Sequence, residues 1–491
     1  MEHISWNLEV GSLSSALIIV LGWVFLSLIV GVMAGIKRKF TLEGYLVSGR
    51  TLGLIFLYVL MAGEIYSAYA FLGTGGWAYS YGMPIMYAIG YGALAYSFGY
   101  FYARYVWKAG KAFGCVTQAD YFQVRYNSKA LAVLVALIGI IFNIPYLQLQ
   151  LQGLGYIVHV GSLGSITPKA GIVIGMIIMM IYVYTSGLRG ISWTNLLQAT
   201  LMFIVAWVVL FTIPFKQFGG IGELFKTLAQ TKPDHLILHP PLGISWYVST
   251  LILSGLGFFM YPQLYPSIYG ARDLKTLKRN YVLLPLYSIF MIPVILAGFT
   301  VAALGIKLSA PDEAVLKAVE ITYPSWVLGV VGAAGFAAAA STASAILLSL
   351  AGLLSKNLYA IAKPTASDKE LVLVSRISVI LLGLLAMGLA LYSPGRLVSL
   401  LLLAYAGMTQ MFPGAVFGLF WKRMNKYATG TGIIAGLITV AYLRLVLKKN
   451  PLGIHFGLWG LLVNIIVTLI VAYLTKPEEE LFTRFKEAVS V

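Results

Sequence analysis

Charged side chains are scarce in this sequence. Asp, Glu, Lys and Arg make up 10% of its 491 residues, whereas a soluble domain carries roughly 25%. The single cysteine, Cys115, excludes an intrachain disulfide. The five histidines sit near segment ends and in loops. Because neither a His/Glu metal cluster nor a Ser/His/Asp set falls inside an apolar run, the sequence does not favour an intramembrane enzyme.

Apolar residues are correspondingly abundant, at 59% of the chain with a mean hydropathy of +0.87. The apolar runs are too long for barrel strands of about 9–11 residues, and only helices and closed barrels span a bilayer. We therefore predict an all-α polytopic membrane protein with about thirteen transmembrane helices. The predicted spans lie near 13–35, 51–72, 83–107, 130–159, 170–187, 191–214, 245–271, 280–306, 325–355, 371–393, 397–421, 427–447 and 455–475.

The distribution of basic residues predicts the orientation of the chain. With thirteen spans, about 24 of the 34 Lys and Arg residues fall on the side of the C-terminus. An excess of Lys and Arg marks cytoplasmic loops, so we predict a multi-pass plasma-membrane protein with its N-terminus outside and its C-terminus cytoplasmic. The net charge of +17 follows from this asymmetry. It suits contact with anionic lipid headgroups and does not indicate nucleic-acid binding.

The segment 61–82 carries features that a plain spanning helix lacks. It contains a carboxylate, Glu64, and a cluster of glycines, Gly73, Gly75 and Gly76. A charged side chain near the bilayer centre costs at least ~2.5–3.5 kcal/mol, and glycines loosen a helix while allowing close backbone approach. We predict a helix that is locally broken near 61–73 and lines a polar cavity in a transporter.

A second interruption is expected in the segment 252–266, where Gly255 and Gly257 precede Pro262 and Pro266. Proline removes a helical hydrogen bond and clashes with the preceding turn. Two interrupted spans in corresponding positions of two five-helix halves point to a transporter binding site. Because five is odd, the halves are expected to be inverted. The expected regions are an extra N-terminal helix (1–40), a first repeat (41–214), an extracellular connection (215–244), a second repeat with its break near 255–263 (245–421), two C-terminal helices (422–475) and a cytoplasmic tail (476–491).

The span 325–355 is built almost entirely from small residues and contains the adjacent hydroxyls of Ser341 and Thr342. Hydroxyl and backbone carbonyl oxygens can bind a sodium ion, although the same pattern also occurs in helices that only pack closely. In the span 130–159, Gln148, Gln150 and Gln152 cannot all lie on one helical face. One or two of them are expected to line a cavity.

Several stretches together resemble the sodium:solute symporter family, over roughly residues 41–474. The resemblance rests on five stretches, which read in order TLEGYLVSGRTLG, VTQADYFQVRYNSK, SGLRGISWTNLLQATLM, MYPQLYPSIYGARDLKTLKR and FPGAVFGLFWKRMNKYATGTGIIAG. The third looks similar to proline permeases. The resemblance implies a LeuT-type fold of 5+5 inverted helices, with one extra helix before and two after. It also implies symport by alternating access.

The resemblance further implies one sodium site between the first broken helix and the small-residue helix. Its ligands by position are the carbonyls of Gly63, Tyr66 and Ala338 and the hydroxyls of Ser341 and Thr342. A second sodium site found in some members is not expected, because this chain has Asn195 and Ala345 where those members have aspartate and serine. In proline permeases an important aspartate aligns with Ile65, so the carboxylate at Glu64 is displaced by one residue, about 100° around a helix.

The solute is expected midway between the two breaks. The candidate residues are Ser67 and Tyr69 from the first break, Ser254, Phe258, Tyr261, Pro262 and Gln263 from the second, and Gln148 and Thr409 as walls. Proline permeases carry tryptophan and tyrosine at the positions of Ser254 and Phe258. This pocket suits a small polar solute such as an amino acid or a monocarboxylate. Arg189 and Asn195 are expected to be gate or loop-fastening residues.

Glu64 has three competing roles. It could neutralise sodium, bind an ammonium group of the solute, or carry a proton if it is unpaired, since burial disfavours the charged form. The sequence therefore predicts a secondary active symporter coupled to one sodium ion, with proton coupling through Glu64 as the alternative. A transporter-like sensor or a channel is a further alternative.

Overall fold

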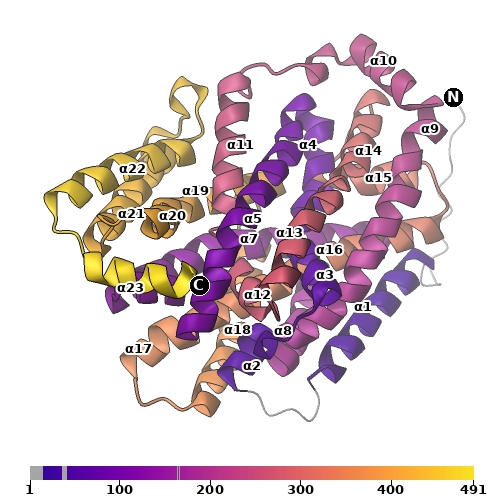
Figure 1. The fold of residues 1–491 in the computed structure, drawn as a ribbon. Coiled ribbons are helices and arrows are strands. Elements are labelled where there is room, and N and C mark those ends of the chain that lie inside the picture. The colour runs from indigo at the N-terminus through magenta and orange to yellow at the C-terminus, as the bar shows by residue number, and fades with distance from the viewer. Residues whose placement is uncertain (1–14, 36–40, 163, 165, 491) are drawn as a thin grey trace, which may run out of the picture.

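The computed structural model describes residues 15–35, 41–162, 164 and 166–490. In these residues the chain forms helices and no β-strand, apart from one isolated bridge between Leu52 and Ala271, so the predicted all-α class is confirmed (Figure 1). Residues 1–14 and 36–40, with the predicted outer N-terminus and the basic loop after the first span, lie outside the described residues.

The helices are α1 (Ser15–Met33), α2 (Leu42–Val47), α3 (Leu54–Ile65), α4 (Thr74–Tyr81), α5 (Tyr87–Phe113), α6 (Gln118–Tyr126), α7 (Lys129–Gly161), α8 (Pro168–Val208), α9 (Ile213–Phe218), α10 (Ile221–Thr231), α11 (Ile244–Phe258), α12 (Leu264–Gly270), α13 (Leu274–Ser288), α14 (Met291–Ala303), α15 (Ala314–Glu320), α16 (Ser325–Gly352), α17 (Ala360–Ala362), α18 (Asp368–Tyr392), α19 (Leu397–Met408), α20 (Phe412–Phe420), α21 (Lys426–Ala441), α22 (Phe456–Leu474) and α23 (Glu479–Ser490). Short 3₁₀ or π turns join several of them, including η2 (Tyr69–Gly73) and η6 (Pro311–Glu313).

The number of spans depends on how bent helices are counted. By length and apolar composition, nine helical stretches of the described residues can cross a membrane, or ten if the bent pair formed by α3 and the stretch Tyr69–Tyr81 is one span. The stretch Pro168–Phe218 covers two predicted spans, because Gly187 (φ 56°) bends α8. The predicted number of thirteen stays a prediction.

The central helices form two groups that contact each other. The first group, here called the bundle, contains α3, α4, α5, α11, α12, α13 and α14; the second, the scaffold, contains α7, α8, α16 and α18. Within the most apolar window of α16, 94% of the residues are buried, against 28% in the helix that begins with α21. The small side chains of α16 explain this, because they let neighbouring helices approach closely. α16 is therefore the central helix of the scaffold.

The two interrupted helices of the bundle run antiparallel. At one end, the N–H of Leu52 donates to the carbonyl of Gly270 at 2.9 Å, just before α3 and at the end of α12. At the other end, Trp77 of α4 stacks on Trp246 of α11 with ring centroids 5.5 Å apart. The pair is thus joined at both ends, and its two breaks lie at the same level in between.

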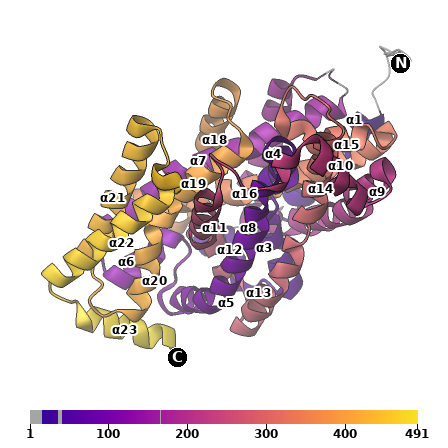
Figure 2. The same ribbon diagram turned by 90° about the horizontal axis from the view of Figure 1, so that it is seen from above.

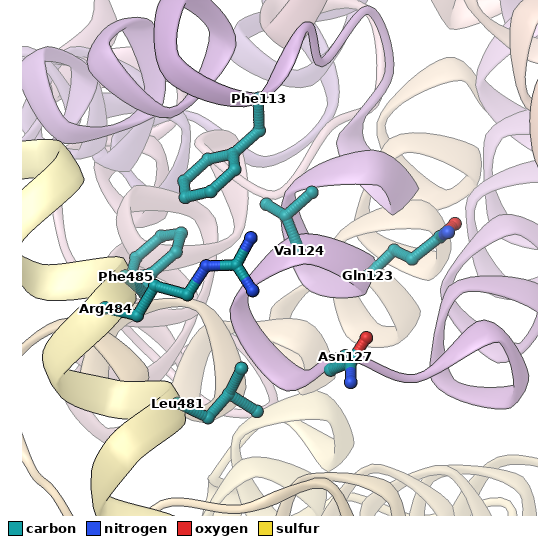
Figure 3. Close-up of a pocket in the computed structure, with 7 residues that line it drawn as sticks. All are labelled: Phe113, Gln123, Val124, Asn127, Leu481, Arg484 and Phe485. Atoms are coloured by element: carbon teal, nitrogen blue, oxygen red, sulfur yellow. The ribbon is translucent and has the colours of Figure 1, made fainter.

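The C-terminal helices lie to one side of this core. Figure 2 shows α21, α22 and α23 at the end of the molecule opposite to α9 and α10. Phe485 of α23 stacks on Phe113 at the end of α5, with centroids 5.8 Å apart. Beside this stack, Arg484 points into a pocket of about 160 Å³ that α5, α6 and α23 enclose (Figure 3). The pocket lies at the α23 end of the 27-residue α5 and so is separate from the breaks.

Candidate functional site

The first break separates α3 from α4, and the two helical stretches are bent by 57°. Beyond α3, the N–H of Ser67 donates only two residues back, at 3.1 Å. The N–H of Ala68 donates to Gln150 Oε1 on α7 at 2.7 Å. In a continuous helix these N–H groups would bond to the carbonyls of Gly63 and Glu64. The break therefore releases two carbonyl oxygens inside the protein.

Ser341 and Thr342 on α16 face the released carbonyls. Each hydroxyl oxygen lies 2.9 Å from the carbonyl oxygen of Gly63, and Ser341 Oγ lies 3.1 Å from that of Ala338. All four residues are buried. Tyr66, the fifth predicted ligand, is the C-cap residue at which α3 ends. The structure thus brings four of the five predicted ligand residues into direct contact, and we call this cluster the oxygen cradle.

The oxygen cradle suits a hard cation, because every candidate ligand is an oxygen atom. Both hydroxyls now donate to a carbonyl, so an arriving sodium ion would require them to turn their hydrogens away and present lone pairs. The site is also tight. A Cβ at Gly63 would lie 2.6 Å from Asn195 Nδ2 and 3.2 Å from Ser341 Cβ, so a larger residue would push α3 away from α16.

Glu64 turns its carboxylate away from the oxygen cradle. The residue is 3% exposed, and its Oε1 accepts a hydrogen bond from the Ser267 hydroxyl on α12. Its backbone carbonyl instead faces Thr342 Oγ1 at 3.4 Å. Among the described residues, Glu64 Oε2 has no hydrogen-bond partner. The carboxylate therefore links the end of α3 to α12, whereas the backbone carbonyl of the same residue faces α16.

The second break lies between α11 and α12 and contains Pro262, which has no N–H to donate. The freed carbonyl of Met260 accepts a hydrogen bond from Gln118 Nε2 on α6 at 2.8 Å. Gln263 Oε1 accepts one from Asn143 Nδ2 on α7 at 2.9 Å. Side chains from two neighbouring helices therefore satisfy the polar groups that the proline break leaves unpaired.

The three glutamines of α7 divide between two faces of that helix. Gln148 Nε2 donates to the Ser393 carbonyl after α18 at 2.6 Å, and the Gln152 amide pairs with the backbone of Gly395 at 2.7 and 3.0 Å. Gln150, on the other face, contacts the first break. Because residues four apart share a face, we correct the expected cavity glutamine from Gln148 to Gln150.

The face of α7 that carries Gln150 also meets the second break. Tyr146, four residues earlier, packs on Tyr261 with ring centroids 5.0 Å apart, and Tyr261 packs on Tyr405 of α19 at 5.0 Å. Within the described residues, Gln150 Nε2, Tyr261 Oη and Ser254 Oγ are buried without a hydrogen-bond partner. Buried polar groups are nearly always paired, so these three donors indicate a place for a ligand.

The remaining candidate residues of the solute site are buried, but most of their polar atoms are engaged. Tyr69 Oη donates to Tyr87 Oη at 3.1 Å. Thr409 Oγ1 donates to the Leu253 carbonyl at 3.1 Å and so fastens the end of α19 to α11. The ring of Phe258 forms an apolar wall beside other aromatic rings. These residues therefore form the walls of the region, and most of them have no unpaired polar atom to offer a solute.

The two predicted gate or loop residues lie on α8. Arg189 follows the bend at Gly187 by two residues. Asn195 Nδ2 donates to the Leu60 carbonyl of α3 at 3.4 Å. The structure therefore places Asn195 directly beside the first broken helix, next to Gly63.

Sequence reasoning missed three residues that hold the breaks: Ser267, Asn143 and Gln118. Each contacts a residue far away in the chain, and the pair of Ser267 and Glu64 is 203 positions apart. One signal was available for Ser267, since it follows Gln263 by four residues and so shares its helical face. Nothing in the sequence alone connected Gln118 to the second break.

Comparisons with known proteins agree with this geometry. The model of the sodium:solute symporter family matches residues 45–436. The chain is 34% identical to the uncharacterized symporter YhjB of Bacillus subtilis, covering 94% of this chain and 98% of that one. It is 28% identical to the monocarboxylate transport permease protein of Rhizobium johnstonii, covering 86% and 88%.

A solved structure supports the fold. The substrate-bound, outward-open structure of a Na+-coupled sialic acid symporter superposes with a TM-score of 0.79 at 22% identity, covering 94% of this chain and 98% of that one. The LeuT-type helical architecture is thereby confirmed. The family match covers most of the chain, and the relatives are transporters rather than enzymes. This chain belongs to the sodium:solute symporter family.

Proposed function

We propose that this symporter couples one sodium ion to the inward movement of a small carboxylate-bearing solute by alternating access. Membership of the family supports Na+-coupled symport. The observation that carries the proposal for the solute is the set of unpartnered buried donors, Gln150 Nε2, Tyr261 Oη and Ser254 Oγ. A carboxylate is the acceptor that several buried donors suit, since hydrogen bonds to an ionised group are the stronger ones.

The sodium ion is proposed to occupy the oxygen cradle of Gly63, Tyr66, Ala338, Ser341 and Thr342. The support is the contact between the hydroxyls of α16 and the carbonyl that the first break releases. The cradle joins the bundle to the scaffold, so an ion bound there would hold the two groups of helices together. Its binding would then favour one of the alternating conformations.

The solute is proposed to bind on the other side of the first break, against α7 and the second break. Ser67, Tyr69, Phe258, Pro262, Gln263 and Thr409 form its walls in this proposal, with Gln150 in place of Gln148. The relative named as a monocarboxylate transport permease is consistent with an acidic solute. Aromatic rings and amides in these walls suit a compact solute, such as a short monocarboxylate or an amino acid.

Glu64 discriminates between these two classes of solute. An ionised Glu64 would repel a plain monocarboxylate and would attract the ammonium group of an amino acid. A protonated Glu64 would accept a monocarboxylate and could contribute a proton to coupling. The unpartnered Oε2 leaves room for either role, and proton coupling stays the alternative to sodium coupling.

The test is uptake into proteoliposomes that contain the purified protein. Labelled lactate, pyruvate, proline and alanine are offered under an imposed sodium gradient and, separately, under a proton gradient. We expect concentrative, saturable uptake of a carboxylate-bearing solute driven by sodium. Uptake driven by protons alone, and lost in Glu64→Gln, would replace sodium by the proton as the coupling ion. Ion flux without saturation would indicate a channel.

Cell-membrane vesicles of known sidedness test the proposed orientation, with the C-terminus in the cytoplasm. In inverted and right-side-out membrane vesicles, protease should remove a tag after residue 491 only when the cytoplasmic face is exposed. The opposite accessibility would reverse every assignment of inside and outside made from the basic residues.

A further inference from the structure

Asp312 is a buried carboxylate that lies apart from both breaks. It belongs to η6, between α14 and α15, and is 5% exposed. Its Oδ2 lies 3.5 Å from the backbone N–H of Leu397, the first residue of α19. The span Leu397–Phe420 begins at this end, and at its other end the Leu419 carbonyl accepts a hydrogen bond from Lys486 of α23. By the charge distribution the Leu397 end faces outside.

The loop that carries Asp312 is attached to α4. Tyr79 Oη donates to the Ile306 carbonyl at 2.9 Å and accepts from the Leu308 N–H at 3.2 Å. Gly76 allows a still closer contact, since a Cβ there would lie 2.8 Å from the Pro311 carbonyl oxygen and 2.9 Å from Asp312 Cα. The loop and α4 therefore form one unit within the bundle.

α19 lies on the other side of this contact, packed against α7 of the scaffold. A second link runs parallel to that of Asp312. The guanidinium of Arg396, just before α19, hydrogen-bonds the Tyr81 hydroxyl at the end of α4 and lies 5.8 Å from the centroid of its ring. Two polar links thus join the α4 unit to the start of α19 on the proposed outer side.

We propose that Asp312 is a gate residue that holds the outer side closed by linking the α4 unit to the first turn of α19. The inference rests on the proposed alternating access, in which α4 must move relative to α19 for the outer side to open. Opening would expose Asp312 to water and separate its carboxyl from the Leu397 N–H. Asp312 is thus a positioning residue for the transport cycle and contacts neither ion nor solute.

The charges around Asp312 give the gate a pH dependence. Arg396 precedes α19, Glu313 is the neighbour in η6, Tyr81 ends α4 and Tyr156 approaches from α7. Burial raises the pKa of Asp312 to about 6, although the Leu397 N–H and Arg396 partly offset this effect. In the open state the exposed carboxyl would return toward its ordinary pKa of about 3.9.

The direction of the pH effect follows from the difference between the pKa values of Asp312 in the two states. Because the pKa is higher in the closed state, protonation stabilises the closed state relative to the open one. Lowering the pH from 7 to 5 should therefore decrease the open-to-closed ratio by about tenfold. Above pH 7 the ratio should be nearly constant, since the carboxyl is ionised in both states.

The experiment measures this ratio directly, without transport. Spin labels are attached at Gln230→Cys on α10 and Tyr392→Cys at the end of α18, both exposed, in a Cys115→Ser chain held in nanodiscs. Double electron–electron resonance then gives the populations of short and long distances at pH 5 and pH 7. α10 packs on α14 of the bundle, so this distance reports on the outer side.

Two variants should shift the populations in opposite directions. Asp312→Asn keeps the acceptor for the Leu397 N–H but carries no charge, so it should favour the short distance and lose the pH response. Tyr81→Phe removes the hydroxyl that accepts from Arg396 across the gate, so it should increase the long population about threefold and keep the pH response. Glu313→Gln is the matched control, expected to keep the pH response with a midpoint at slightly lower pH, because the Glu313 charge makes a minor contribution to raising the Asp312 pKa.

Retention of the pH response in Asp312→Asn would overturn the proposal, as would a Tyr81→Phe distance distribution that equals the wild type. His235, which contacts the Tyr79 carbonyl at 3.0 Å, would then be the group to replace. Because no solute or sodium gradient enters this measurement, its outcome is independent of the uptake assay. Failure of uptake with a preserved pH response would reject the proposed solute and leave the gate intact.

Discussion

The two breaks of the bundle differ in what they leave unpaired. At the first break the freed groups are carbonyl oxygens, and two hydroxyls of α16 donate to that of Gly63, each at 2.9 Å. At the second break the Met260 carbonyl is already satisfied by Gln118, and the unpartnered atoms are the side-chain hydroxyls of Ser254 and Tyr261. The first break therefore suits a cation, and the second suits an organic acceptor.

Both breaks free backbone carbonyl oxygens. The first break contains no proline; the Ala68 N–H turns to Gln150, and hydroxyls of α16 meet the freed carbonyls. The second break contains Pro262, whose missing N–H also leaves a helical carbonyl without its donor, and the Met260 carbonyl there is met by the amide of Gln118. The breaks therefore differ in the groups that meet their carbonyls, which are hydroxyls at the first break and an amide at the second.

The largest effect is expected when the hydroxyls of the oxygen cradle are removed, which tests whether the first break binds the cation. In Ser341→Ala/Thr342→Ala we expect the sodium concentration for half-maximal uptake to rise by at least about 100-fold, more than the loss of outer partners costs at metal sites. Sodium-dependent uptake in proteoliposomes measures this. Ser344→Ala, whose hydroxyl donates to the Ser341 carbonyl at 2.9 Å, is the control. Unchanged sodium dependence in the double variant would remove the cradle from the mechanism.

Glu64→Gln tests the link between the two breaks. We expect kcat/KM for uptake to fall about 10- to 100-fold, since a buried hydrogen bond to a charged group contributes roughly 1.5–3 kcal/mol. Ser267→Ala should reproduce part of the loss if the link to α12 matters, and none of it if Glu64 acts only on the solute or a proton. Normal concentrative uptake by Glu64→Gln would show that the carboxylate is dispensable.

Tyr261→Phe sharpens the comparison at the second break. Removal of one unpartnered donor should raise the KM for the solute about tenfold while the half-saturating sodium concentration stays within about twofold. Initial rates at varied solute and varied sodium separate the two effects. Tyr265→Phe is the matched control, because its hydroxyl pairs with Tyr102 at 3.0 Å. Equal effects of both variants would contradict a role for Tyr261 in binding.

The smallest expected effect belongs to Gln118→Leu. This change leaves the buried Met260 carbonyl without its donor and should lower the stability by about 1–3 kcal/mol. A thermal-unfolding assay in detergent should show the loss, with sodium dependence unchanged. A large change in sodium affinity would mean that the two breaks are not as independent as their contacts indicate.

Much of the fold could be predicted because membrane helices follow from apolar length. Both breaks were also predictable, since Glu64 and Pro262 conflict with a continuous span, although Gly75 and Gly76 lie within α4 and not at the first break. The cradle hydroxyls were predicted by position, and the structure brings them to Gly63. The count of thirteen spans was harder, because α11 is short and Gly187 bends α8 without ending it.

The remaining features depend on contacts that local patterns do not encode. The choice between Gln148 and Gln150 depends on which face of α7 meets the first break, and the periodicity alone fixes only that they differ. The direction of the Glu64 carboxylate depends on Ser267, which is 203 residues away. Packing sets the rotation of each helix about its axis. Because neighbouring residues point about 100° apart around a helix, this rotation decides which side chain reaches the site.

The antiparallel pair of broken helices, joined through Leu52 and Gly270 at one end and Trp77 and Trp246 at the other, has an evolutionary consequence. The contacts at both ends maintain the relative position of the two breaks without a contribution from a bound ion or solute. Substitutions at residues 254–263, in the proposed solute site, could therefore change which molecule is carried while the proposed sodium ligands of α16 stay the same. Related transporters with this pair of helices could therefore differ in their solutes and share the same coupling ion.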